Sequence, residues 1–281
     1  MKIAVLGSSG FIGSAVCNSL ESYKDITVIR YKGRLSKYTD YKDFLSGVEV
    51  IIYCVGIAHF DRNTSTDSIK SATNADFLAA SQFFEFINNK SIKRIIYLSS
   101  VNVFGKNSLE RAPFSLNSVC YPSDLVSKAK LAIESRIISA CSSTEYVIIR
   151  SPLVYGKGVK ANFLSLVNLA KKNLPLPLGA INNSRSLVAL DNIVDLIITC
   201  IDHPKAANQT FLVSDDCDVS TTELIKMMTR AAGKKPWLLP IPMSWFRLAG
   251  KLTGKQAIVD RLCGNLQVDI SHTKQTLGWK P

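Results

Sequence analysis

The segment Gly7-Ser8-Ser9-Gly10-Phe11-Ile12-Gly13 follows directly after the short apolar run Lys2–Leu6, and it decides the fold of this chain. The apolar run predicts a buried strand, and the residues after the segment predict a helix. Glycine is needed at three points of such a loop: for a tight turn, for close approach of the backbone to a pyrophosphate, and for close packing of helix on strand. The amide groups at the start of the helix would then face the phosphates. The expected dinucleotide contacts are Gly7, Ser9, Gly10, Phe11, Ile12 and Gly13.

Apolar runs and helix-sized segments continue to alternate through the first 150 residues. Such alternation is typical of a parallel sheet with helices on both faces, because the crossover between two parallel strands usually contains a helix. The sequence therefore predicts an α/β protein with a doubly wound, Rossmann-type sheet. Further buried strands are expected at Ile26–Ile29, Val48–Cys54, Arg94–Leu98 and Tyr146–Ile149, and long helices at Ser68–Asn89 and Pro122–Ala140.

The pattern loosens after about residue 150, where Pro152, Pro175 and Pro177 interrupt it. Helical periodicity returns near Asp191–Ile201 and Thr221–Ala232. We expect a dinucleotide-binding domain at residues 1–155 and a smaller substrate-binding lobe at residues 156–281, interleaved with the sheet as one compact unit. The lobe would lie at the carboxyl edge of the sheet, where α/β folds bind their ligands.

The end of the second predicted strand bears on the choice of cofactor. An acidic residue there binds the ribose 2′-hydroxyl of NAD, whereas an arginine can accept the 2′-phosphate of NADP. This chain has Arg30 at that point, with Lys32 and Arg34 close behind, so the sequence favours NADP(H) and leaves NAD(H) open. The alternative is a solvated basic loop. Val55 and Gly56, which follow the third strand, are expected to line the same site.

Composition excludes several classes of protein. Hydrophobic residues make up 47% of the chain, which fits a globular protein with a substantial core. No run of eighteen apolar residues occurs, so no membrane span is expected. The seven scattered cysteines form no C-x-x-C pair, and His203 and His272 lack metal-ligand spacing, which favours a reducing cytoplasm and no metal. The net charge of +12 suits an anionic partner, yet no basic run with interleaved aromatic residues points to nucleic acid.

Several motifs occur in an order that resembles one family. They are the glycine segment, Leu98-Ser99-Ser100, Pro122-x-Asp124 leading to Lys130, and Arg150-x-Pro152-x-x-Tyr155-Gly156. Together they resemble the extended short-chain dehydrogenase/reductases, also called the NAD-dependent epimerase/dehydratase family, which act on nucleotide sugars. Segments 159–163, 174–179, 183–188 and 277–279 are similar to the UDP-4-keto-6-deoxy-N-acetylhexosamine (UDP-N-acetylquinovosamine) 4-reductases of bacterial surface-polysaccharide synthesis.

The resemblance implies roles for single residues. Ser100 matches the catalytic hydroxyl that hydrogen-bonds the sugar C4 oxygen, and Lys130 matches the lysine that holds the cofactor ribose. Asn74 matches a structural asparagine on the long helix beneath the active site. The remaining matches lie on the substrate side, where guanidinium groups suit a pyrophosphate because their donors bind its oxygens in pairs. These matches are Asn102, Lys160, Asn162, Arg185 and Arg261.

One position departs from the family pattern. Members carry Tyr-x-x-x-Lys on the helix near residue 122, a spacing that places both side chains on one helix face. The lysine lowers the pKa of the phenol, which exchanges a proton with the sugar oxygen. With Lys130 as the lysine, the tyrosine position falls on Val126; a second register through Lys128 would place Asp124 there. Neither register supplies a tyrosine.

Three explanations of this departure stay open: a non-catalytic relative, a mutant of an active enzyme, or an enzyme that uses another acid, such as Tyr121, Tyr155 or an ordered water. The resemblance implies NAD(P)H-dependent reduction of the 4-keto group of a UDP-linked 6-deoxy-N-acetylamino sugar. The alternatives are a UDP-hexose 4-epimerase and a non-catalytic protein that binds NADP or a nucleotide sugar. By family analogy, a homodimer would pair through the two long helices.

Overall fold

Six parallel strands form the central sheet, in the order β2-β1-β3-β4-β5-β8. The computed structural model describes residues 1–31, 33, 35–36, 41–56, 65–87, 91–108, 112–141, 143–159, 161–254 and 256–281. Because the chain passes from β1 outward to β2 and then back to β3 on the other side, the strand order reverses between β1 and β3, which is where such sheets bind dinucleotides. The strands are β1 (Lys2–Leu6), β2 (Thr27–Tyr31), β3 (Val50–Tyr53), β4 (Arg94–Ser100), β5 (Glu145–Ser151) and β8 (Gln209–Leu212).

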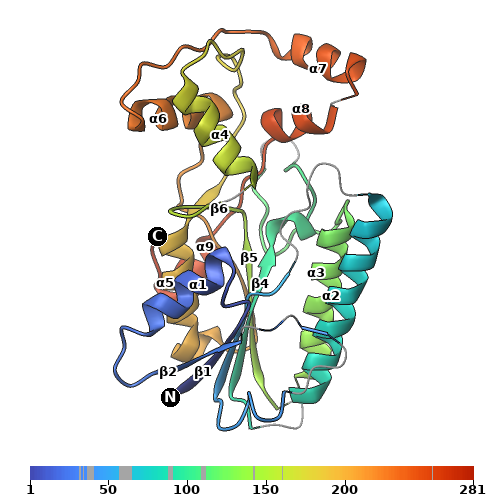
Figure 1. The fold of residues 1–281 in the computed structure, drawn as a ribbon, viewed down its shortest axis with the longest axis vertical. Coiled ribbons are helices and arrows are strands. Elements are labelled where there is room, and N and C mark those ends of the chain that lie inside the picture. Colours follow the sequence, from blue (N-terminus) through green and yellow to red (C-terminus); the bar gives the residue numbers. More distant parts are fainter. Residues whose placement is uncertain are drawn as a thin grey trace.

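Helices cover both faces of this sheet (Figure 1). The helices α1 (Phe11–Leu20), α5 (Leu190–Asp202) and α9 (Ser271–Leu277) cover one face. The other face carries α2 (Thr66–Ile87) and α3 (Leu125–Ala140), which pack side by side. Each face has its own apolar core, because alternate residues of the buried strands point to opposite sides. The doubly wound Rossmann-type sheet expected from the sequence is therefore confirmed.

The predicted elements agree with the observed ones to within a few residues. The run Lys2–Leu6 is a strand over its whole length, whereas α3 begins at Leu125 and not at Pro122. The reason is the N-cap: Asp124 has extended backbone, and its Oδ1 accepts the amide of Ser127 at 2.9 Å. This cap fixes which residues of α3 face the sheet.

A smaller lobe lies beyond the carboxyl ends of the strands, at the top of Figure 1. Its helices are α4 (Ala161–Lys172), α6 (Thr221–Ala231), α7 (Met243–Leu252) and α8 (Gln256–Cys263), and a third apolar cluster around Leu178 and Ile225 packs them together. A short parallel pair, β6 (Leu153–Tyr155) with β7 (Leu187–Ala189), leads from the lobe to the sheet. The described residues also include the short 3-10 helices η1 (Val101–Val103) and η3 (Pro204–Ala206).

Parts of the chain after residue 155 return to the sheet, since α5, β8 and α9 all pack there. The short strands β6 and β7 and the edge strand β8 are elements that the sequence patterns did not predict. In the described part of the chain, no helix is both long and apolar enough to cross a membrane.

Candidate functional site

The glycine segment forms a tight turn in which side chains at Gly7 and Gly13 would clash with neighbouring backbone atoms. Gly7 has φ of 81°, and a Cβ there would lie 2.9 Å from the carbonyl carbon and oxygen of Cys54, just after β3. A Cβ at Gly13 would lie 2.8 Å from the carbonyl carbon of Gly7 and would collide with the attached oxygen. These contacts make glycine necessary at both positions, and they hold the start of α1 close to the end of β1.

The start of α1 is open towards this turn. Gly10 is its N-cap, and no side chain of the described residues caps the helix amides. Ser9 and Gly10 are exposed, whereas Ser8 is buried and its Oγ donates to the carbonyl oxygen of Tyr31 at 2.8 Å. Phe11 and Ile12, the other expected contacts, begin the helix. Uncapped amides with a positive helix dipole can receive a diphosphate, so this element fits the expected cofactor.

Arg30 does not extend into the turn in this structure. Its guanidinium donates to Glu21 at 2.8 and 2.9 Å and to Asn18 Oδ1 at 2.8 Å, at the C-terminal end of α1. Hydrogen bonding to Arg30 lowers the pKa of Glu21. Because this pair lies at the surface, it is weak and screened, and a bound 2′-phosphate could displace it. Lys32 and Arg34, the other basic residues expected here, lie outside the described residues.

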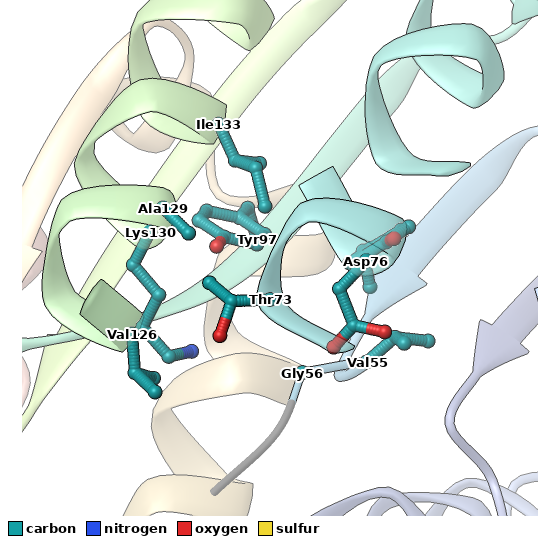
Figure 2. A pocket seen from close by; sticks show the side chains of 10 residues that line it. Val55, Gly56, Thr73, Asp76, Tyr97, Val126, Ala129, Lys130 and Ile133 are labelled. Carbon is teal, nitrogen blue, oxygen red and sulfur yellow. The ribbon is translucent and has the colours of Figure 1, made fainter. Parts of the chain in front are cut away.

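Lys130 and Val126 face the same small pocket between α2 and α3 (Figure 2). They are four residues apart on α3, so they lie one turn apart on one face. A Cβ built at Gly56 would lie 3.5 Å from Lys130 Nζ, which puts the backbone after β3 beside the ammonium group. Lys128, the lysine of the second register, is exposed instead. The pocket is lined by Tyr53, Val55, Gly56, Thr73, Asp76, Tyr97, Val126, Ala129, Lys130 and Ile133.

The surroundings of Lys130 hold its ammonium group against the carboxyl end of β4. Its Nζ donates to the carbonyl oxygen of Leu98 at 3.1 Å and lies 5.7 Å from the centre of the Tyr97 ring. Burial lowers the pKa of Lys130, and the carboxylate of Glu134 opposes that effect. The Tyr97 hydroxyl is buried and has no hydrogen-bond partner among the described residues, and burial raises its pKa well above 10. Tyr97 is thus a poor proton donor despite its place in the pocket.

Ser100 lies at the carboxyl end of β4, two residues beyond the carbonyl that binds Lys130. It is half-buried and is the N-cap of η1, where its Oγ accepts the amide of Asn102 at 3.2 Å. A hydroxyl that accepts in this way keeps its own proton for donation. The end of β4 therefore carries Ser100 itself and binds Lys130 through the carbonyl of Leu98, so both residues lie at the same edge of the sheet.

A buried ionic network supports this edge from below, and the sequence patterns did not reveal it. Ser99 Oγ donates to Glu134 Oε1 in a short hydrogen bond, and Glu134 Oε2 accepts Arg150 Nη2 at 2.7 Å. Arg150 also stacks on Phe104, with 4.7 Å between the guanidinium carbon and the ring centre. The network joins β4, α3 and β5, so it fixes how Ser100 and Lys130 are presented. The signal that could have identified it is the position of Glu134, four residues after Lys130 on one helix face.

The tyrosines suggested as substitute acids are placed elsewhere. Tyr121 is 79% exposed, before the start of α3. Tyr155 stacks on Phe163, and its hydroxyl donates to Asp215 Oδ2 at 2.7 Å; burial and this bond raise its pKa to about 12. Asn74 is exposed on α2 and does not line the pocket as the neighbouring Thr73 does.

Two of the expected substrate residues come together in the smaller lobe. Arg185 Nη1 donates to the carbonyl oxygens of Arg261 and Gly264 at 2.9 and 3.0 Å. Burial and the nearby Arg261 charge both lower the pKa of Arg185. Both guanidinium groups are positive, so an anion bound near them would relieve the unfavourable effect of Arg261 on the Arg185 charge. Lys160 lies outside the described residues, as does the side chain of Asn162 at the start of α4.

Comparison with known proteins agrees with this architecture. Residues 3–214 match the family model described as NAD dependent epimerase/dehydratase family. The chain is 41% identical to a UDP-glucose 4-epimerase of Vibrio cholerae over 297 aligned positions, which cover 100% of this chain and 90% of the relative.

Two solved structures share the fold at low sequence identity. Each match covers 100% of this chain and 94% of the solved chain. One is a Bacillus cereus UDP-glucuronic acid 4-epimerase in complex with UDP-glucuronic acid and NAD, with 17% identity and a TM-score of 0.79. The other is RMD from Pseudomonas aeruginosa complexed with NADPH, with 16% identity and a TM-score of 0.75. The extent of the family match and the 41% identity together show that the chain belongs to the NAD dependent epimerase/dehydratase family.

Proposed function

We propose that this chain acts on C4 of a UDP-linked hexose, and that its reaction is 4-epimerisation with a bound nicotinamide dinucleotide. The proposal rests on one observation: Ser100, Lys130 and the glycine segment lie at the same edge of the sheet. The smaller lobe, which contains Arg185 and Arg261, lies next to this edge. The 41% identity to a UDP-glucose 4-epimerase over the whole chain supports this reaction over others.

The glycine segment and the pocket would hold the cofactor. Gly7 and Gly13 leave space that any side chain would fill, and the open amides of α1 would bind the pyrophosphate. Lys130 and Gly56 would contact the ribose next to the nicotinamide. A nicotinamide bound there would supply a reversible hydride acceptor for C4. Arg30 is a candidate for the 2′-phosphate of NADP, although its contact with Glu21 favours neither form.

Ser100 and the lobe would position the sugar. The Ser100 proton would hydrogen-bond the C4 oxygen and polarise it as it changes between hydroxyl and ketone. Arg185 and Arg261 would hold the diphosphate, with Arg185 already oriented by two backbone carbonyls. Asn102, Lys160 and Asn162 belong to the same proposed substrate side.

Val126 limits the chemistry that these groups can perform. It lies four residues before Lys130 on α3, the place from which the family's tyrosine would reach the C4 oxygen. A valine has no proton to exchange, and loss of a positioned acid or base costs about 10²–10⁴-fold in rate. Tyr97 is buried, Tyr121 is exposed to solvent and Tyr155 already donates to Asp215, so we infer that the proton passes through water and that turnover is slow.

Two other functions are alternatives, and they differ from epimerisation in cofactor consumption and turnover. A 4-reductase of a UDP-4-keto-6-deoxy-N-acetylhexosamine, the reaction expected from the C-terminal motifs, would consume one NAD(P)H for each sugar. A binding protein would take up NAD(P) and UDP-sugar with a rise in melting temperature but no turnover. The presence of Ser100, Lys130, Arg185 and Arg261 together favours an enzyme over the binding protein.

The first test is to incubate the purified chain at high concentration with UDP-glucose and NAD and to quantify UDP-galactose by chromatography while recording absorbance at 340 nm. Epimerisation predicts UDP-galactose without net change in NADH, and this activity should be lost in Ser100→Ala. Steady NADPH oxidation with the 4-keto sugar, without epimerisation, would establish the reductase. Ligand-induced stabilisation without either reaction would support the binding protein.

The proposal extends to a homodimer that pairs through α2 and α3. Each of these helices exposes a large apolar side chain, Leu78 on α2 at 52% and Ile138 on α3 at 50%. Light scattering after size exclusion tests this: Leu78→Glu with Ile138→Glu should convert a dimer to a monomer.

A further inference from the structure

The helix α7 at the outer end of the smaller lobe has apolar side chains on two opposite faces, and only one of them is packed. Met243 and Phe246 pack on the apolar cluster around Leu178 and Ile225. On the same side Gly250 is buried, and a Cβ there would lie 2.8 Å from Val259 Cγ2 of α8. The inner face of α7 therefore has its partner within the lobe.

The outer face of α7 presents a stripe of large apolar side chains to solvent. Trp245 is 69% exposed, Leu248 58% and Leu252 79%, and the spacing of three and four residues places them in one row. Ile258 on α8 and Trp237 before α7 are also exposed, at 47% and 58%. Exposed apolar side chains that scatter singly need no explanation, but a row on one helix marks an interaction surface. We call the row Trp245, Leu248 and Leu252 the outer stripe.

Basic residues accompany the outer stripe on α7 and are frequent in the neighbouring sequence. Arg247 and Lys251 are exposed on α7 itself. Residues 224–259 contain no Asp or Glu and seven basic residues, which are Lys226, Arg230, Lys234, Lys235, Arg247, Lys251 and Lys255. An amphipathic helix with tryptophan and leucine on one face and basic residues beside it has the composition of helices that lie in the interface of an anionic membrane.

We propose that α7 docks the smaller lobe on the surface of a membrane that contains anionic phospholipids, with the outer stripe inserted among the headgroups. Each Lys or Arg near such a surface adds attraction, and the net charge of +12 works in the same direction. A second copy of the chain fits the surface less well, because a two-fold contact would bring the basic residues of both copies, Arg247 and Lys251 among them, into one interface with no acidic residue from 224–259 to offset them. The proposal does not depend on the reaction catalysed.

Co-sedimentation with vesicles tests the proposal. The whole chain should sediment with vesicles of equal parts phosphatidylglycerol and phosphatidylcholine, and much less with phosphatidylcholine alone. Leu248→Glu with Leu252→Glu should weaken binding about ten-fold or more, because two inserted side chains become charged. The control is Tyr23→Ser, which removes an apolar side chain of 48% exposure from the turn between α1 and β2; it should bind like the parent.

A second pair of measurements separates docking from a folding defect of the glutamate variant. Arg247→Gln with Lys251→Gln keeps the apolar stripe and should weaken binding to anionic vesicles, as should raising the salt from about 0.1 M to 1 M, which shortens the Debye length from about 10 Å to 3 Å. Trp245 emission should shift to the blue on binding, a shift that Trp245→Phe removes. The proposal is overturned if the parent chain does not bind anionic vesicles, or if the variant with Leu248→Glu and Leu252→Glu binds them as the parent does. It is equally overturned if the stripe instead holds a dimer in solution without any vesicle binding.

Discussion

Replacing Glu134 with glutamine would leave the buried Arg150 guanidinium without its counter-charge. The side chains of these residues are only 3% and 11% exposed, and two guanidinium nitrogens contact the carboxylate, at 2.7 and 3.2 Å. Glutamine has nearly the same shape and can still accept the hydrogen bond of Ser99 through its amide oxygen. With that oxygen on Ser99, the amide NH2 faces Arg150, so the substitution removes the counter-charge and places two hydrogen-bond donors against each other.

The expected loss of stability is large for a single substitution. Removing one partner of a buried ion pair costs about 3–5 kcal/mol, because the other charge stays buried without compensation. A chain of roughly this size loses about 2–4 °C in melting temperature for each kcal/mol, so Glu134→Gln should lower the melting temperature by roughly 6 to 20 °C. Replacing both partners, with Glu134→Gln and Arg150→Met, should recover part of this loss.

Thermal unfolding followed by circular dichroism measures the effect. The matched control is Glu21→Gln, which removes the partner of Arg30 from a surface pair and should leave the melting temperature unchanged within error. If Glu134→Gln melts like the parent chain, or if the double variant is less stable than either single variant, the buried pair does not organise this edge of the sheet and the reasoning fails.

Three further predictions follow from individual residues. Gly13→Ala should lower the affinity for NAD about ten-fold or more, measured by titration calorimetry, because its Cβ would collide with the Gly7 carbonyl and shift the turn. Alkylation at pH 8 followed by mass spectrometry should label the exposed Cys217 first and the buried Cys200 among the last, since burial hides its thiol and raises its pKa to about 12; equal labelling would contradict the packing. The pKa of Lys130 is lower folded than unfolded, so between these values the unfolded state binds more protons and stability rises with pH. The unfolding free energy of the parent relative to Lys130→Met should thus increase as the pH approaches 10.5 from below, and a decrease would show that Lys130 is not desolvated.

The sheet could be predicted from the sequence because a strand buried on both faces is a short apolar run. Lys2–Leu6 is such a run, and the glycine segment after it follows the geometry of a strand-to-helix turn. The strands β6 and β7 have only three residues each and lie in proline-interrupted segments, so no pattern marks them. The start of α3 was predicted too early because Pro122 precedes the capping Asp124 by two residues.

The candidate site could be predicted only in part. Spacing along α3 placed Val126 and Lys130 on one face, since a helix fixes the relation of residues four apart. The Ser99–Glu134–Arg150 network joins three elements that are distant in sequence, so only the folded structure brings it together. The contact of Arg30 with Glu21 depends on the side-chain conformation that two flexible residues adopt, which no spacing determines. The exposed outer stripe of α7 likewise depends on which of its two apolar faces meets α8.

The most direct test of the proposed chemistry is the rate of UDP-glucose epimerisation by the parent chain and by Val126→Tyr, with Lys128→Tyr as a control that adds a phenol to the exposed side of α3. The account predicts that Val126→Tyr gains about a hundred-fold or more, within the 10²–10⁴-fold range of a positioned acid or base, and that Lys128→Tyr gains nothing. If Val126→Tyr shows no gain although NAD and UDP-glucose both bind, the assignment of Lys130 and of C4 chemistry to this pocket is wrong.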